Sequence, residues 1–350
     1  MGRRKAGARQ TYVGDSTQIS GKNDAIDMVS AMDVAVVVYD GVFDSGLTAI
    51  LDVLDNANAL GAELTASPPT WHVTTVGPQP QVRTAGGLLV DVEPLARADM
   101  AHLLIVAAPN KRPSTALLDQ VSGEATRPVR DLITRGRARG AAVAAACAGT
   151  FLLAETGILD GLRATTTWWL VPSFRTRYPK VHLDQSQMVI TAEGITTAGA
   201  AFGHVDLALA IVRASSPAVA DLVARYLVVD ERPSQSAYVL PSALAQSDPI
   251  VAAFEHWARE RLAQPINIPH AAKSIGVSER TLQRSVQRIL GTSPVRFIQD
   301  LRVERASHLL RTTGMSLETI ARKVGYQHPN TLRVLLRKRT GKTTTTLRGL

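Results

Sequence analysis

Two copies of one short pattern near the C-terminal end constrain the fold of this chain more than any other feature. The first copy occupies residues 272–284 and the second occupies residues 321–333. Their Ala and Gly positions are offset by 49 residues and their Thr-Leu pairs by 50, so the second turn is one residue longer. Each copy predicts a short helix, a glycine turn and a second helix, which is the helix-turn-helix layout.

Positive charge gathers on the same segment. Residues 250–350 carry 18 lysines and arginines against 6 aspartates and glutamates, a balance of +12, whereas the whole chain carries +9. Binding to the phosphates of nucleic acid requires such a basic surface. The repeats and the charge together predict double-stranded DNA as a partner. The alternative is an all-α accessory or protein-docking module, which would leave the basic outer faces without a purpose.

The first copy separates apolar from polar residues along its second helix. Leu282, Val286, Ile289 and Leu290 recur at helical spacing and should face inward. Arginine and glutamine near the start of such a helix can reach base edges in the major groove, whereas other basic side chains hold phosphates. The expected base-reading residues are Arg280, Thr281, Gln283, Arg284 and Gln287, and the expected phosphate contacts are Lys273, Arg288 and Arg296.

The second copy follows the same logic. Ser316 should cap its first helix, and Leu332, Leu335 and Leu336 should face inward in its second helix. Residues 295–310 predict a long helix that holds the two units apart. The outer-face candidates are Gln327, His328, Asn330, Thr331 and Arg333.

These residues resemble the AraC/XylS family of transcription regulators over about residues 250–340. The matching stretches are Ser-Glu-Arg-Thr-Leu-Gln-Arg at 278–284, Gly-Thr-Ser-Pro at 291–294, Leu-Arg-Val-Glu-Arg-Ala at 301–306 and Ile-Ala-Arg-Lys-Val-Gly-Tyr at 320–326. The resemblance implies that each unit enters one of two successive major-groove segments. Two departures stand out: Val334 replaces a usual arginine, and Gly-Lys-Thr-Thr at 341–344 replaces a usual Gly-x-Ser-Pro. We therefore expect the first unit to discriminate sequence more than the second.

The N-terminal two thirds alternate apolar runs with helical segments. Strands are predicted at residues 34–39, 71–76, 88–90, 103–107 and 142–146, and helices near Leu47–Leu54 and at 114–121 and 128–137. Such alternation predicts an α/β layered domain with a mostly parallel sheet. The Gly86-Gly87 pair is interpreted as a hairpin turn, since no helix follows it.

Cys147, the single cysteine of the chain, lies between an apolar strand and a helix predicted at 151–155. A strand-to-helix elbow places its central side chain at a helix N-terminus, where the helix dipole lowers the pKa of a thiol and amides can form an oxyanion hole. That is the setting of a nucleophile. The alternative is a small buried cysteine that follows a core strand.

The same region resembles the DJ-1/PfpI group of class I glutamine amidotransferase-like domains over about residues 33–215. The resemblance rests on Val-Val-Val-Tyr-Asp-Gly at 36–41, the Cys147 elbow, Thr-Gly-Ile-Leu-Asp-Gly-Leu-Arg-Ala-Thr-Thr at 156–166 and Thr-Ala-Gly at 197–199. It implies a flavodoxin-like α/β sandwich. Some members of the AraC family carry such a domain for sensing, and such domains also dimerise.

Catalysis by the thiol would need a base within reach. In the resembled group this base is commonly a histidine after Ala-Thr-Thr, whereas here Thr167 and Trp168 follow that motif. Threonine does not accept a proton near neutral pH, so we do not expect an enzyme. Four other histidines match no catalytic position, and His204 is expected to pack against its own helix: His72, His102, His182 and His204.

A ligand pocket without catalysis remains the expectation for this domain. Asp44 stands near the group's acidic position and is equally well interpreted as the N-cap of a helix that begins at Ser45. Cys147 could alternatively act as a redox switch. The expected pocket residues are Asp44, Cys147, Ala148, Thr166, Thr167 and Trp168.

The predicted organisation is a flexible tail at 1–32, an α/β sensing or dimerisation domain at 33–230, a linker at 231–249, a DNA-binding domain at 250–342 and a frayed end at 343–350. One cysteine excludes a disulfide framework and a Cys-rich zinc site, and we expect no metal and no cofactor. No apolar run approaches the roughly 20 residues that span a bilayer, and no apolar core follows the basic N-terminus, so a cytoplasmic protein is expected.

The sequence therefore predicts a DNA-binding transcription regulator that forms a homodimer, with an unknown small-molecule effector and RNA polymerase as a further candidate partner. Two alternatives stay open. One is a Cys147-dependent hydrolase or amidase fused to a DNA-binding module. The other is a dimerisation scaffold without a ligand.

Overall fold

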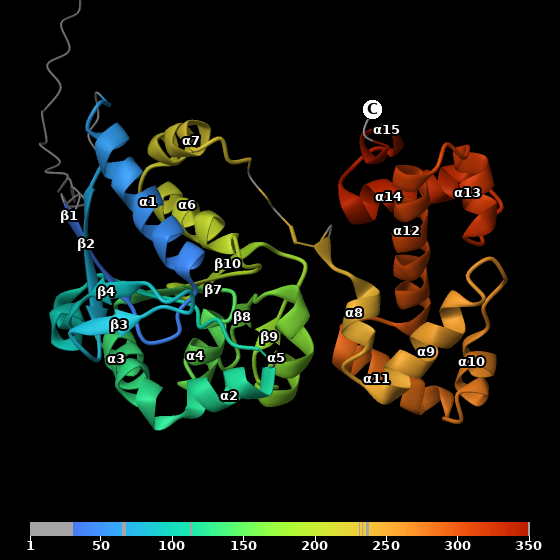
Figure 1. Ribbon diagram of the computed structural model, residues 1–350, viewed down its shortest axis with the longest axis horizontal. Coiled ribbons are helices and arrows are strands. Elements are labelled where there is room, and N and C mark those ends of the chain that lie inside the picture. The colour runs from blue at the N-terminus through green and yellow to red at the C-terminus, as the bar shows by residue number, and fades with distance from the viewer. Residues whose placement is uncertain are drawn as a thin grey trace, which may run out of the picture.

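The computed structural model forms two lobes joined by an extended segment (Figure 1). It describes residues 31–64, 68–112, 114–230, 232, 234–235 and 238–348. The expected flexible tail at 1–32 lies outside the described residues except for Ala31 and Met32. Those two residues begin the first strand, because they pair with Thr70 and Trp71 of the neighbouring strand.

A mixed, mostly parallel sheet forms the centre of the N-terminal lobe, as predicted. Its strand order is β10-β11-β7-β6-β1-β2-β5, and the pairing of β10 with β11 is antiparallel. The four-residue runs in β1 and β6 are fully buried because helices cover both faces. The strands are β1 (Ala31–Val37), β2 (Thr70–Gly77), β5 (Glu93–Pro94), β6 (Leu103–Val106), β7 (Ala142–Ala146), β10 (Val189–Ala192) and β11 (Ile195–Ala198).

Two groups of helices cover the sheet (Figure 1). In α1 the buried residues Leu47, Ile50, Val53 and Leu54 recur at helical spacing and face the sheet. This helix packs with α6 and α7, while α2, α3 and α4 form the other layer. Their bounds are α1 (Asp44–Gly61), α2 (Ser114–Ser122), α3 (Arg127–Ala138), α4 (Gly149–Glu155), α6 (Gly203–Ser215) and α7 (Pro217–Tyr226).

Smaller elements complete this lobe. The strands β3 (Gln81–Arg83) and β4 (Leu89–Asp91) form an antiparallel hairpin. Gly87 has a φ of +93° and the Thr84 amide donates to Leu88 at 2.9 Å, so the predicted hairpin turn at the glycine pair is confirmed. A two-stranded ribbon and one helix lie toward the other lobe: β8 (Arg163–Ala164), β9 (His182–Leu183) and α5 (Val171–Arg177).

The segment expected to be a linker contains structure of its own. A short helix, α8 (Pro241–Ala245), lies inside it, and α9 (Pro249–Arg259) begins at its last residue. Asp248 caps α9, since its carboxylate accepts from the amides of Ile250 and Val251 at 2.9 and 3.1 Å. Residues 231, 233, 236 and 237 of the expected linker lie outside the described residues.

The C-terminal lobe contains two hydrophobic cores that share one helix. The N-terminal half of α12 contributes Phe297 and Leu301 to the first core, and its C-terminal half contributes Ala306 and Leu310 to the second. The predicted separating helix is therefore confirmed, together with its inward face. The remaining helices are α10 (Ile268–Ser274), α11 (Glu279–Leu290), α12 (Pro294–Thr312), α13 (Leu317–Lys323) and α14 (Pro329–Thr340).

The expectation of a frayed C-terminal end is wrong for the described part of it. A last short helix, α15 (Thr344–Leu347), follows Thr343, whose hydroxyl accepts from the Thr346 amide at 3.1 Å. Leu347 is buried in the second core, and the burial of this side chain holds the end in place. Residues 349 and 350 lie outside the described residues. No described helix combines the length and the apolar character needed to cross a membrane.

Candidate DNA interface and elbow site

The first helix-turn-helix unit bends tightly between α10 and α11. Gly276 has a φ of +75°, a left-handed conformation that glycine adopts without strain. The Ser278 hydroxyl then accepts from the Thr281 amide at 3.1 Å and caps α11. Leu282 and Val286 are fully buried on the inner face of this helix, so its polar face points outward.

Every residue predicted to read DNA in the first unit is exposed, but their side chains differ in freedom. Gln283 donates to Glu279 at 2.8 Å, and Arg288 pairs with Asp248 at 2.5 Å. Two arginines make no hydrogen bond or ion pair with any described residue and are free to reach a ligand. The exposed set is Lys273, Arg280, Thr281, Gln283, Arg284, Gln287 and Arg288, of which Arg280 and Arg284 are the two free arginines.

The second unit also presents its predicted residues, in a weaker arrangement. Arg333 donates to the Asn330 side chain at 2.8 Å, so these two candidates are engaged with each other. Val334, one residue further, is 65% exposed and offers only an apolar surface. The exposed candidates are Gln327, His328, Asn330, Thr331 and Arg333.

One arginine fixes the two units relative to each other. Arg302, in the middle of α12, donates to the carbonyls of Leu262 and Gln264 at 3.1 and 2.8 Å, and its guanidinium lies 5.2 Å from the Tyr326 ring centroid. Gly325 has a φ of +84°, and a Cβ there would lie 2.2 Å from the Leu262 carbonyl oxygen. The turn of the second unit therefore packs directly on a loop of the first.

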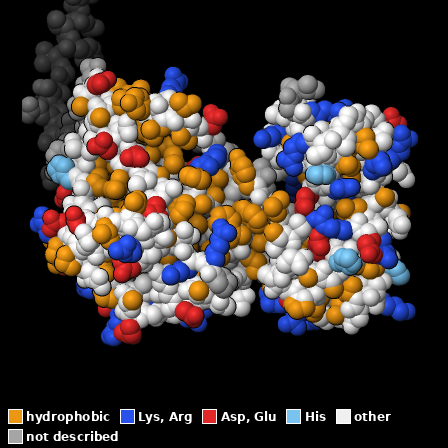
Figure 2. Space-filling model, in the orientation of Figure 1, with side chains coloured by type: hydrophobic (Ala, Val, Ile, Leu, Met, Phe, Trp, Pro, Cys, Tyr) orange, Lys and Arg blue, Asp and Glu red, His pale blue; other side chains and the backbone are white. Residues whose placement is uncertain are grey.

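Basic side chains are distributed over the surface of the C-terminal lobe (Figure 2). A groove of about 1040 Å³ runs along the outer face of α11. Glu279, Arg280, Arg284 and Pro294 are among the residues that line it. The groove and the free arginines lie on the helix that the sequence predicts to read bases.

The elbow in the N-terminal lobe has the expected backbone. Cys147 has a φ of +54°, a strained conformation for a residue with a side chain. Its amide donates to Ala198 at 2.8 Å and its carbonyl accepts from the Thr166 hydroxyl at 2.6 Å. The neighbouring strand and the Ala-Thr-Thr motif therefore hold the elbow in place.

The thiol itself does not behave as the elbow suggests. Burial raises the pKa of Cys147 to about 11, and this effect outweighs the lowering by the Ala148 backbone and by Arg112. This environment agrees with the alternative of a small buried cysteine that follows a core strand. The strand that leads to Cys147 is part of the buried hydrophobic core, and removal of water disfavours the thiolate.

We expect Cys147 to react slowly with iodoacetamide in the folded protein. A pKa near 11 leaves a thiolate fraction at pH 7.5 that is roughly 100-fold or more below that of a free cysteine. Mass spectrometry of time points should show slow alkylation that becomes fast in denaturant and faster as pH rises toward 11. Rapid labelling of native protein at pH 7.5 would contradict this assignment, and Cys147→Ser provides the blank.

Asp44 is committed to the hairpin next to it. Its carboxylate accepts from the Thr84 hydroxyl, and from the Gly86 amide at 2.8 Å. The Thr84 hydrogen bond lowers the pKa of this carboxyl. The alternative role as a helix N-cap is wrong, because α1 begins at Asp44 and Phe43 precedes it as the N-cap.

The threonine run and Trp168 lead from the elbow toward the other lobe. Thr165, Thr166 and Thr167 are fully buried, whereas Trp168 is partly buried and packs against the first C-terminal core. The structure thus places Thr166 beside Cys147 and directs Trp168 away, to the junction of the lobes. The pocket expected from these residues stays a prediction.

Gln235 is a site residue that the sequence did not indicate. Although it follows the Pro- and Ser-containing segment, it is fully buried and donates to the Thr166 carbonyl at 2.8 Å. Its Oε1 accepts from the Trp168 amide at 3.2 Å. A glutamine within a polar segment carries no periodic signal, so only the fold reveals that the connection between the lobes is anchored beside the elbow.

His204 is buried at the first turn of α6 and does not resemble a catalytic base. Nδ1 lies 2.6 Å from the Ala201 carbonyl oxygen, which can only accept, so Nδ1 carries the proton. Burial lowers the pKa of His204 to about 4. The ring fills the space above Gly46, where a Cβ would lie 2.7 Å from it. His204 therefore has a packing role, as expected, but its ring packs on α1 and not on its own helix.

Two family models match the chain. The model described as "DJ-1/PfpI family" matches residues 32–214, and the model described as "Helix-turn-helix domain" matches residues 271–349. The first match covers more than half of the chain and corresponds to the α/β lobe. The second corresponds to both units of the C-terminal lobe.

Two curated relatives match more than half of the chain. The chain is 27% identical over 294 residues to "HTH-type transcriptional regulator CdhR" of Pseudomonas aeruginosa, covering 81% of this chain and 82% of that protein. It is 29% identical over 207 residues to "HTH-type transcriptional regulator ArgR" of the same species, covering 58% of this chain and 63% of that protein. The matched region therefore spans somewhat less than two thirds of the latter.

Two solved structures are similar to part of the chain. One is an AraC family transcriptional regulator from Pseudomonas putida, with a TM-score of 0.46, 20% identity and coverage of 56% of this chain and 99% of that one. Another is Drosophila melanogaster DJ-1beta, with a TM-score of 0.46, 18% identity and coverage of 57% and 100%. By its family matches and its curated relatives, the chain belongs to the DJ-1/PfpI family and is an AraC-type transcription regulator with a C-terminal helix-turn-helix region.

Proposed function

We propose that the chain binds specific DNA sequences through its two helix-turn-helix units and that the DJ-1/PfpI lobe controls this binding without catalysis. The observation that carries the proposal is the pair of free, exposed arginines on α11, Arg280 and Arg284, on a helix whose other face is fully buried. Arginine forks onto guanine edges, and the flanking Lys273 is placed to hold a phosphate.

Two features support a non-catalytic lobe. Thr167, at the position where the group commonly has a histidine, is buried and cannot take a proton. The Cys147 thiol, with its pKa raised to about 11, stays protonated at neutral pH. A thiol hydrolase would require a residue that can accept a proton near the thiol, and a thiol that ionises near neutral pH. Turnover of amide or aldehyde substrates that is lost in Cys147→Ser would overturn this part of the proposal.

The connection between the lobes supports control of DNA binding by the N-terminal lobe. Gln235 joins the elbow motif at Thr166 to the segment that leads into α8, and Trp168 packs on the first C-terminal core. A small molecule that displaced either contact would alter how the lobes are joined. The proposal also includes a linker between the two domains at 231–249 and an effector-binding role for the pocket expected around Cys147.

A homodimer is also part of the proposal. Phe202, Tyr226 and Val228 are 59, 64 and 90% exposed at the start of α6 and just beyond α7. Apolar side chains of this size on the surface favour association with another protein surface. A dimer would place paired readers on repeated half-sites, with the cytoplasm as the compartment and RNA polymerase as a further partner.

The test is selection of binding sites from random double-stranded DNA with the full chain. We expect enrichment of a sequence that spans two major-groove segments, with stronger base preference in the segment bound by the first unit. Fluorescence anisotropy should show an affinity for that sequence that falls steeply as salt rises, because bound cations are released from DNA. Failure to enrich any sequence would contradict sequence-specific binding.

A further inference from the structure

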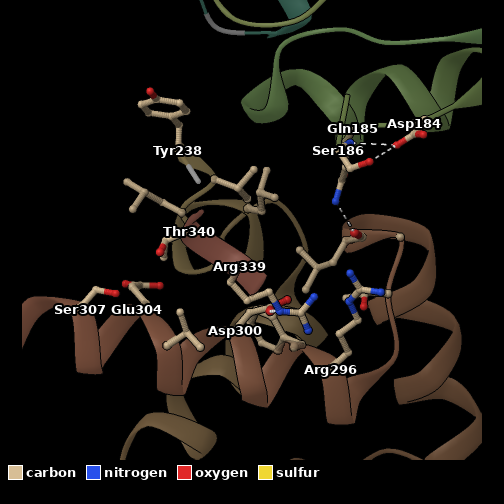
Figure 3. Close-up of a pocket in the computed structure, with 18 of the residues that line it drawn as sticks. Asp184, Gln185, Ser186, Tyr238, Arg296, Asp300, Glu304, Ser307, Arg339 and Thr340 are labelled. Carbon is tan, nitrogen blue, oxygen red and sulfur yellow. Dashed lines mark hydrogen bonds and ion pairs between the residues drawn. The ribbon is translucent and has the colours of Figure 1, made fainter. Parts of the chain in front are cut away.

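A cavity of about 620 Å³ lies where the two lobes meet (Figure 3). Residues 183–186 line it from the N-terminal lobe, residues 238–240 from the connecting segment, and residues of α12 and α14 from the C-terminal lobe. Gln185 donates across the junction to the Leu290 carbonyl, at the end of α11, at 3.0 Å. The cavity is therefore lined by the N-terminal lobe, the connecting segment and the C-terminal lobe, which are the parts that regulation of DNA binding would have to connect.

The acidic side chains in its wall are already neutralised. Each of them has an arginine partner, so none is left to repel an incoming anion. Asp300 and Arg339 face each other within the cavity wall (Figure 3). The pairs are Asp184 with Arg163 at 3.2 Å, Asp300 with Arg339 at 2.8 Å and Glu304 with Arg259 at 2.8 Å.

The basic side chains in the wall are in excess. Four of them form no ion pair with any described residue, although Asp184 attracts Arg175 and Asp300 attracts Arg296 at longer range. Arg175 is the most enclosed of the four: burial lowers the pKa of its guanidinium, and its end lies against Gly291, at the C-terminus of α11. The four unpaired side chains are Arg175, Arg296, Arg311 and Lys342.

Buried polar atoms in the same wall also have no partner. Ser307 is 7% exposed, and its hydroxyl makes no hydrogen bond with a described residue. Arg175 Nη1, Gln185 Oε1 and Thr292 Oγ1 are likewise buried and unpaired. Each such atom costs free energy unless a bound molecule satisfies it. Three of these groups can donate to an acceptor, and Gln185 Oε1 requires a donor.

We propose that this cavity binds a small oxyanion, a carboxylate or phosphate that also carries a hydrogen-bond donor. Arg175 and Arg296 would hold the anionic group, Thr292 would donate to its oxygens, and Gln185 would accept from its donor. A molecule held this way bridges the sensing lobe and α12, the helix shared by both readers. This regulatory role rests on the proposed DNA-binding function, whereas the binding of the anion itself does not.

The test is isothermal titration of the full chain, without DNA, with sodium citrate and separately with sodium phosphate. We expect at least one of the two anions to bind. Binding of citrate would identify the ligand as a carboxylate, and binding of phosphate would identify it as a phosphate. Arg175→Met should weaken binding at least about tenfold, since a charged contact of this kind contributes 1.5–3 kcal/mol. Thr292→Val should also weaken binding while leaving the melting temperature of the free protein unchanged or raised, because it removes an unsatisfied hydroxyl.

Arg280→Met is the matched control, because Arg280 is an unpaired arginine on the DNA-reading face. Binding should be unchanged in this variant. The proposal is overturned if neither anion binds the wild-type chain, or if binding is unchanged in Arg175→Met. DNA affinity of the anion-free protein is measured in parallel. If the wild-type protein bound the anion but did not bind DNA, the proposed function would be contradicted and the anion site would still be supported.

Discussion

Replacing Arg284 with alanine is expected to lower affinity for the selected DNA by about 10- to 100-fold, since one good bidentate contact to a base contributes about 1–3 kcal/mol. The side chain is exposed on α11, makes no hydrogen bond or ion pair within the described residues, and lines the outer groove. Anisotropy titrations give the affinity. A repeated selection should show that base preference is relaxed at one position only.

Two matched variants distinguish recognition of bases from electrostatic attraction to the DNA backbone. Lys273→Ala should weaken binding to specific and random DNA equally and reduce the salt slope by about one, as loss of a phosphate contact does. Arg333→Ala should have a smaller effect than Arg284→Ala, because Arg333 already donates to Asn330 and stands beside the apolar Val334. Unchanged base preference in Arg284→Ala would contradict the assigned reading role.

His204 is expected to make the stability of the folded chain fall between pH 6.5 and 4. Burial lowers the pKa of this side chain to about 4, so the unfolded chain takes up a proton near pH 6.5 while the folded chain does not. Unfolding therefore becomes more favourable as pH falls through this window. The loss is on the order of 3 kcal/mol, and urea titrations at a series of pH values measure it.

His204→Gln should flatten this part of the pH profile. Glutamine retains a donor for the Ala201 carbonyl and does not titrate. His182→Gln changes an exposed histidine in the same lobe and should leave the profile as in wild type. A wild-type pH profile in His204→Gln would show that the acid sensitivity arises elsewhere.

Periodicity predicted most of the fold because it reports which side chains meet a core. The inward leucines of α11 and α14 and the inward face of α12 follow directly from helical spacing. The mostly parallel sheet follows from apolar runs separated by helices. The exposure of the DNA-reading candidates follows for the same reason, since a residue opposite a buried leucine faces water.

The errors arise where long-range contacts decide. Local sequence left a reactive thiol and a buried cysteine both open at Cys147, because the pKa depends on how deeply the elbow is enclosed. Leu347 is held by a core built from residues far away in the chain, so its threonine-rich neighbourhood is misleading. Gln235 acquires its partners only when the connecting segment folds back on the N-terminal lobe, and Arg175 acquires its surroundings only when the two lobes meet; no spacing rule describes either contact.

The helix shared by both C-terminal cores makes DNA binding sensitive to the spacing between the two operator segments as well as to their base sequence. With 19 residues at 1.5 Å per residue, α12 acts as a rod of about 28 Å, and Arg302 locks the second turn against the first unit. The two readers cannot slide apart to accommodate a stretched operator. Half a helical turn of extra DNA between the two segments would rotate one of them away, leaving the protein attached by a single reader.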